Sequence, residues 1–131
     1  MKRSPELAAL SHDHHHALDV ARRLRRADRD DLAAVLAYLD DFWRTRGEEH
    51  FALEERVLVP ELVDEPAWRA GVARMLAEHD EIRARASAVA DVDAAHALGD
   101  LLHDHVRFEE RELFVLLEAS GELARVASRL A

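Results

Sequence analysis

Apolar residues recur every three or four positions along four long segments of this 131-residue chain. This spacing puts them on one face of an α-helix and is typical of helices that bury one side. Proline, aspartate and glycine interrupt the spacing between the segments. We therefore expect helices over residues 4–27, 30–59, 64–90 and 91–121, and a short fifth helix over 122–131.

Each expected boundary carries a residue that favours the start or the end of a helix. In chain order these residues are Ser4 with Pro5, Asp30, Pro60, Asp64 with Pro66, Asp91 or Asp93, and Ser120 with Gly121. The connections are short, so consecutive helices should run antiparallel. The sequence thus predicts an all-α fold: an up-down-up-down antiparallel four-helix bundle with a short C-terminal fifth helix, forming a single domain over residues 1–131.

Histidine and glutamate replace apolar residues on the faces that we expect to point inward. On the first and third helices a lone histidine interrupts the row, at His14 and at His79. The expected row of the second helix is Leu36, Leu39, Trp43, Gly47, His50, Glu54 and Val57 or Leu58. That of the fourth is Leu98, Leu101 or Leu102, His105, Phe108 or Glu109, Leu113 and Leu116. Polar groups therefore occupy core positions on all four helices.

The stretch HFALEERVL, which begins at His50, is nearly copied by HVRFEEREL, which begins 55 residues later at His105. A histidine and a glutamate four positions later lie on the same helix face, one turn apart. An exposed, helix-stabilising pair is the simpler alternative, but the flanking apolar rows argue against exposure. Each half of the chain therefore supplies a lone histidine followed by one His-Glu pair.

Two buried glutamates need compensating positive charge, because an isolated buried carboxylate is strongly unfavourable. Lys and Arg are absent from the inward rows at these levels, so a pair of divalent cations is the simplest compensation. With one metal in each half, Glu54 and Glu109 would bridge the two ions. Imidazole and carboxylate ligands without sulfur suit iron or manganese, with zinc possible. The candidate ligands are His14, His50, Glu54, His79, His105 and Glu109.

Composition narrows the classes of protein further. The chain has no cysteine, which excludes disulfides and thiolate metal sites and fits a cytoplasmic protein. The formal net charge of −9 argues against nucleic-acid binding, and the basic run at residues 22–26 is most simply a solvated helix face. We see no signal peptide and no apolar stretch long enough to span a membrane, so we expect no membrane partner.

Some residues near the candidate ligands allow more than one interpretation. On the first helix we favour His14, which continues the row of Leu7 and Leu10, and keep His15 as the alternative. Glu55 and Glu110 each follow a proposed bridge, and we expect them to be solvated or to support a ligand. The remaining side chains are expected to carry no metal chemistry: His96 and His103 facing outward, and Tyr38 as a packing residue.

Four ordered blocks of the sequence resemble the hemerythrin-like (HHE) cation-binding domains: LSHDHHHAL, EEHFALEERVLVPEL, LAEHDEI and LLHDHVRFEERELF. The resemblance covers nearly the whole chain. It implies a non-haem di-iron centre inside a four-helix bundle, with two iron ions as the cofactor. In the family such centres are associated with oxygen binding, oxygen or redox sensing, and iron handling. Carried over residue by residue, the resemblance points to the six candidate ligands named above.

Two positions depart from the oxygen-carrying hemerythrins. Those proteins have a second histidine four residues after the third-helix ligand, where this chain has Arg83. They use an aspartate five residues after the fourth-helix histidine, where this chain has Glu110 preceded by Glu109. Both departures disfavour reversible oxygen carriage.

Three classes of function fit these residues. The first is a non-haem di-iron protein that binds oxygen or a related small oxidant, acting in sensing, storage or scavenging. The second is a di-iron enzyme, a peroxidase or oxidase acting on peroxide or nitric oxide. The third is a structural bundle whose metal serves folding alone, which we disfavour because six ligands shared by two metals leave positions open. The expected partner is a small-molecule oxidant; the sequence carries no signal for an oligomeric state.

Overall fold

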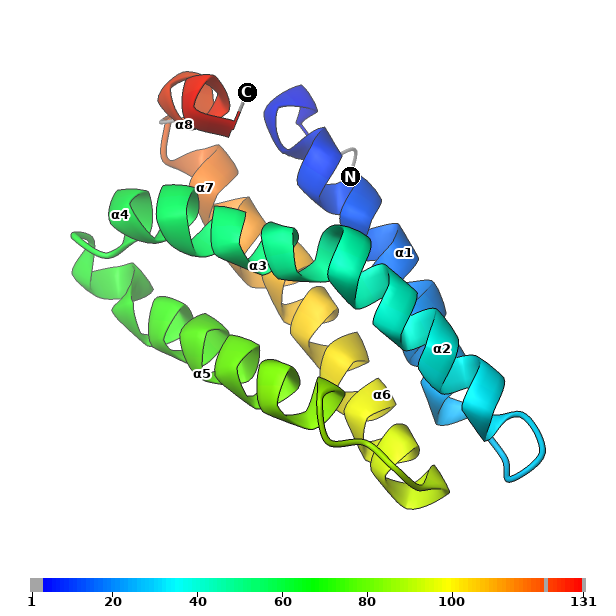
Figure 1. The fold of residues 1–131 in the computed structure, drawn as a ribbon. Helices are drawn as coiled ribbons and strands as arrows, with labels where there is room; N and C mark the ends of the chain where they lie inside the picture. The colour runs from blue at the N-terminus through cyan, green and yellow to red at the C-terminus, as the bar shows by residue number, and fades with distance from the viewer. Residues whose placement is uncertain (1–3, 122, 131) are drawn as a thin grey trace.

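The computed structural model describes residues 4–121 and 123–130, and every element in this part of the chain is helical. The first long helix is α1 (Ala8–Arg25), preceded by the short 3₁₀ turn η1 (Pro5–Leu7). The third is α5 (Arg69–Ala86), preceded by the 3₁₀ turn η4 (Pro66–Trp68). The short helix α8 (Leu123–Leu130) lies beside the start of α1 at one end of the bundle (Figure 1).

The second and fourth long helices are continuous but change their winding along the way. The second runs through α2 (Leu32–Phe42), the π-helical turn η2 (Trp43–Gly47), α3 (Glu48–Leu53), the π-helical turn η3 (Glu54–Leu58) and α4 (Val59–Leu62). The fourth runs through α6 (Val92–Phe108), the π-helical turn η5 (Glu109–Leu113) and α7 (Phe114–Ala119). Figure 1 shows the four long helices alternating in direction, so the predicted up-down-up-down bundle with a fifth helix is confirmed.

The π-helical turns explain why some predicted core positions are wrong. In a π turn each N–H bonds five residues back, so one extra residue enters the helix and the buried face rotates. Before η2 the buried side chains are Val35, Leu39 and Phe42, whereas the predicted Leu36 and Trp43 are only half-buried. After η5 the chain likewise buries Phe114 and Leu117 in place of Leu116.

Helix boundaries follow the predicted signals at the fourth helix. The Asp91 carboxylate caps it by accepting a hydrogen bond of 2.7 Å from the Ala94 N–H. Gly121, with a φ of +79°, follows its end, and glycine adopts this left-handed conformation without steric cost. The Asp30 cap predicted for the second helix is wrong. The Asp28 and Asp31 carboxylates instead close a tight turn, and the helix begins at Leu32.

The second helix also continues beyond Pro60, where we predicted that it would stop. Proline has no N–H, so it cannot bond to the carbonyl of Arg56 four residues earlier. The Arg129 guanidinium donates to that carbonyl at 3.2 Å, and the helix then runs on to Leu62. A side chain from α8 thus satisfies the backbone group that the proline leaves unbonded.

Two apolar clusters fill the bundle, with a polar layer between them. One cluster includes Ala17, Phe51 and Val106, and the other includes Leu10 and Phe108. On each long helix the polar residues of the layer lie between members of the two clusters. The buried polar residues among those described are His14, His50, Glu54, His79, His105 and Glu109. None of the described helices is long and apolar enough to cross a membrane.

Candidate metal centre

Each of the four long helices contributes to the polar layer at the middle of the bundle. The histidines come from α1, α3, α5 and α6, and the two glutamates are the first residues of η3 and η5. The π turns therefore begin at the same offset of the duplicated stretch, immediately after each His-x-x-x unit. Such turns occur often at functional sites, where they direct a side chain that an α-helix would place elsewhere.

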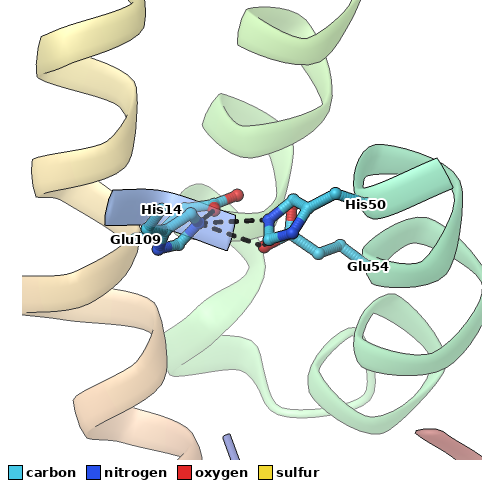
Figure 2. A group of neighbouring side chains, drawn as sticks. All are labelled: His14, His50, Glu54 and Glu109. Atoms are coloured by element: carbon cyan, nitrogen blue, oxygen red, sulfur yellow. Dashed lines mark hydrogen bonds and ion pairs between the residues drawn. The ribbon is translucent and has the colours of Figure 1, made fainter. Parts of the chain in front are cut away.

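The first group of side chains consists of His14, His50, Glu54 and Glu109, and Figure 2 shows them facing one another across the bundle. The His14 Nε2 lies 2.8 Å from the Glu109 Oε1 and 3.1 Å from the His50 Nε2. The His50 Nε2 lies 3.3 Å from the Glu54 Oε2. Two imidazole nitrogens and two carboxylate oxygens thus converge on one point.

The second group consists of His79, His105, Glu54 and Glu109. The His79 Nε2 lies 3.2 Å from the Glu54 Oε1 and 3.3 Å from the Glu109 Oε2. The His105 Nε2 lies 3.1 Å from the same Glu109 oxygen. Within each group the potential ligand atoms lie within 4.8 Å of one another, so each group could hold a metal ion. Both glutamates belong to both groups and turn one oxygen toward each.

Each of the four histidines is oriented by its own carboxylate from outside the cluster. Each Nδ1–H donates to that carboxylate, which leaves the Nε2 directed at the centre, an arrangement that fixes ring orientation around metals. The distances are 2.6 Å for His14 to Glu110, 3.1 Å for His50 to Asp13, 2.8 Å for His79 to Glu55 and 2.8 Å for His105 to Glu78. All four imidazoles are therefore held in the orientation that a metal ligand needs.

The supporting carboxylates are themselves held in place. The Arg83 guanidinium donates two hydrogen bonds to Glu55, of 2.8 and 2.9 Å. Arg74 donates to Glu78 at 3.0 Å and Arg46 to Asp13 at 3.3 Å, while the Ser11 hydroxyl donates to Glu110 at 2.8 Å. Residues on the surface of the bundle thus stabilise the positions of the buried rings.

The charges of the cluster are incompletely balanced by the protein. Glu54 is fully buried, yet neither of its carboxylate oxygens accepts a hydrogen bond, and the His105 Nε2 also has no hydrogen-bond partner. The buried polar residues that the structure describes include neither Lys nor Arg. Burying polar atoms without partners costs free energy of folding. Bound cations would provide partners for the two Glu54 oxygens and for the His105 Nε2. The donor set therefore fits metal ions.

The pKa values of the histidines respond to the same unbalanced charge. Burial alone would lower the pKa of His79, but the hydrogen bond to Glu109 and the charge of the adjacent Glu54 carboxylate raise it to about 9. Burial would also lower the pKa of His105, but the negative charge of the adjacent Glu109 carboxylate raises it to about 10. Burial would raise the pKa of Glu109, yet the neighbouring histidines hold it well below its usual value. Without metal, protons on the histidines balance the carboxylates.

The structure brings together all six side chains that the sequence singled out. It buries His14 and leaves the alternative, His15, exposed. Glu55 and Glu110 support histidines from outside the cluster. Other residues lie away from it: His12 is exposed, His16 packs edge-on against Tyr38 and Phe42, His96 bonds to the Ala27 carbonyl, and His103 contacts Asp104.

Sequence reasoning missed two supporting acids, Asp13 and Glu78. Each directly precedes the lone histidine of its half, and each supports the histidine of the His-Glu pair in the same half. The second glutamate of each duplicated stretch supports the lone histidine of the other half. The acidic residue before both His14 and His79 was the available signal. It becomes meaningful only when the helices are placed side by side.

An apolar cavity adjoins the cluster. The space open to the centre of a water-sized sphere measures about 20 Å³, and no polar atom contributes to its surface. His14, His50 and His105 belong to its lining. The rest of the lining is Asp13, Ala17, Leu39, Phe42, Trp43, Gly47, Phe51, Ile82, Ala86, Leu98, Leu102 and Val106. The volume would admit one water molecule, but a water needs polar partners that this surface lacks, so the cavity should stay dry.

Comparison with known proteins gives one match. The family model described as the hemerythrin HHE cation binding domain matches residues 6–117, which include all six clustered side chains. No curated protein and no solved structure matches the chain significantly.

Proposed function

This chain belongs to the hemerythrin HHE cation-binding domain family, and we propose that its buried cluster holds two iron ions. One ion would be held by His14 and His50 and the other by His79 and His105, with Glu54 and Glu109 shared between them. The resulting non-haem di-iron protein would bind dioxygen or a related small oxidant, in oxygen or redox sensing, storage or scavenging. Manganese and zinc are compatible with these ligand types and are the less favoured alternatives, because iron is the metal that the family resemblance implies.

One observation supports this proposal above the others: two buried carboxylates each belong to two separate groups of histidine nitrogens. A single cation would leave one pair of histidines without a role and would balance only part of the buried charge. Two divalent ions would balance both carboxylates and use all four Nε2 atoms. The four outer carboxylates support the same conclusion, because they orient every ring toward the centre.

Bound iron would supply one-electron redox chemistry that no side chain of the cluster provides. The residues of the chain hold and shield it. The Nδ1 hydrogen bonds fix the ring tautomers, and the apolar clusters on both sides keep bulk water away. The dry cavity beside His14 and His50 offers space to an uncharged small molecule. A metal used for folding alone needs no such space, so the cavity favours a binding function.

A second candidate, a di-iron enzyme that turns over peroxide or nitric oxide, is supported by Arg83. Its guanidinium bonds to Glu55 and so provides no further ligand at the position where an oxygen carrier has histidine. Six protein side chains shared by two ions leave positions for a reacting molecule. On this basis we expect oxidation in air more readily than reversible oxygen binding.

Optical titration of the iron-loaded protein tests the proposal. The protein is reduced under anaerobic conditions, mixed with dioxygen in a stopped-flow instrument, and then returned to an oxygen-free atmosphere. We expect a fast spectral change that oxygen removal does not reverse. A fully reversible change would favour a carrier over the enzyme. No spectral change in a chain that carries two irons would contradict a function in oxidant binding.

A further inference from the structure

The lining of the cavity meets solvent at three side chains. Asp13, Trp43 and Ala86 are half-buried, whereas the other residues that line the cavity are buried. Because the remaining walls are formed by the cores of the long helices, a molecule from solvent would reach the cavity beside these three residues. The identity of the side chain that must move decides what can enter.

Two of the three side chains are poor candidates for movement. The Asp13 carboxylate accepts hydrogen bonds from the His50 Nδ1 and from Arg46, at 3.1 and 3.3 Å, which hold it in place. Ala86 ends at its Cβ and cannot turn aside. The Trp43 indole is the only large side chain of the three, and no hydrogen bond from its ring nitrogen is described.

The Trp43 ring lies against Gly47, which has no side chain and so leaves room for the ring. A Cβ at Gly47 would lie 2.7 Å from the Trp43 Cε3 and 3.0 Å from the Phe42 Cε2, closer than side chains tolerate. Trp43 is the first residue of the π-helical turn η2, and Gly47 is the last. On its inner side the indole packs edge-on against Phe51, with ring centroids 5.3 Å apart. The ring thus covers the cavity through apolar contacts alone.

We propose that Trp43 controls access to the cavity and selects for molecules of diatomic size. Movement of the indole over Gly47 would admit an uncharged diatomic such as dioxygen or nitric oxide. Bulkier oxidants, such as organic hydroperoxides, would be excluded by size. Hydrogen peroxide would lose its hydrogen bonds to water in a space without polar partners. This inference deepens the proposed function and rests on it for the identity of the oxidant, but not for the route.

Xenon tests the route without iron or oxidant chemistry, because it binds to dry apolar cavities. The exchange rate of xenon with the purified 131-residue chain is measured by ¹²⁹Xe NMR for the wild type, Trp43→Ala and Trp43→Phe. We expect exchange to be about tenfold faster or more for Trp43→Ala and to rise less for Trp43→Phe, since gating by one ring sets the barrier. Trp68 is the matched control: it is also half-buried but packs against the other apolar cluster.

The outcomes separate the route from the proposed function. Equal xenon exchange in the wild type and both Trp43 variants, or equal acceleration in Trp68→Phe and Trp43→Phe, would overturn the role of Trp43. In the reduced iron-loaded chain, Trp43→Ala should accelerate oxidation by tert-butyl hydroperoxide more than oxidation by dioxygen. An equal acceleration would overturn size selection. Faster xenon exchange in a chain that binds no iron would support the gate and contradict the proposed function.

Discussion

The two groups of the cluster use the same kinds of ligand but differ in their surroundings. Both histidines of the first group, His14 and His50, line the apolar cavity. In the second group only His105 does, because the His79 ring lies against the face of Phe51, with centroids 3.8 Å apart. The first group is therefore accessible from the cavity, whereas part of the second is closed by an aromatic ring.

The carboxylates that support the histidines also differ between the two groups. In the second group, His79 is held by Glu55, which Arg83 grips with two short hydrogen bonds. In the first group, the Asp13 that holds His50 receives a single longer bond of 3.3 Å from Arg46. Two hydrogen bonds from one guanidinium fix a carboxylate more firmly than one. The comparison indicates that His79 of the second group is more firmly anchored than His50 of the first, and that the first group is open to a small ligand.

Removal of a shared carboxylate should have the largest effect, because it affects both groups at once. Glu54→Ala or Glu109→Ala should reduce the iron content from two ions per chain to nearly none, as measured by elemental analysis. Glu55→Ala and Glu110→Ala should retain most of the metal, since they act through a histidine. Loss of metal in Glu110→Ala with none in Glu109→Ala would show that the bridge lies five residues after His105.

Loss of one histidine should affect one group. His14→Ala should reduce the content to about one iron per chain, because the anchored second group keeps its ligands. His12→Ala and His15→Ala are the matched controls on exposed positions of the same helix, and they should retain both ions. Equal losses in all three variants, or a dominant loss in His15→Ala, would mean that the helix is rotated relative to the structure.

The supporting arginines should have smaller and unequal effects. Arg83→Ala should weaken iron binding about tenfold, the lower end of the range for residues that orient a metal ligand. Arg46→Ala should weaken it less, because its single bond to Asp13 is longer and more exposed. Arg85→Ala, which removes an exposed ion pair with Glu81, provides the control. Competition with a calibrated chelator measures the iron affinities. Equal losses of affinity in Arg83→Ala and Arg46→Ala would contradict the difference in support between the two groups.

The pH dependence of the metal-free chain should show the smallest effect. The folded pKa values of His79 and His105, about 9 and 10, lie above the ordinary 6.5. Protonation therefore stabilises the folded state fully below pH 6.5, and this stabilisation is lost as the pH rises through 9 to 10. The unfolding temperature in chelator should fall over this range, while that of the metal-loaded chain should change less. A rise in the metal-free chain would contradict the charge balance described here.

The sequence predicted the bundle and the content of the cluster because both follow from helical spacing. His50 and Glu54, like His105 and Glu109, lie four residues apart within one turn, so their common face could be derived locally. Val57, Leu58 and Leu113 are buried as predicted, but Leu36, Trp43 and Leu116 are not, because nothing in the local pattern announces the π turns η2 and η5. The extra residue in η2 rotated the preceding face and misplaced Trp43, which is half-buried and lines the cavity.

Contacts between helices could not be predicted from the sequence for a different reason. Asp13 supports a histidine on another helix, 37 residues away, and Glu55 supports one 24 residues away. Such pairs depend on how the helices are rotated against one another, which no single-helix pattern determines. Arg83 is the clearest case: its place in the sequence indicated a missing ligand, and its contacts identify it as an anchor for Glu55.

The stoichiometry of iron binding tests the central claim most directly. The full chain is purified, stripped with a chelator, reconstituted with ferrous iron under anaerobic conditions, and desalted before elemental and protein analysis. Two groups that share Glu54 and Glu109 predict two iron ions per chain, bound together and lost together in Glu109→Ala. One ion or fewer per chain after full reconstitution would contradict the shared, two-metal site.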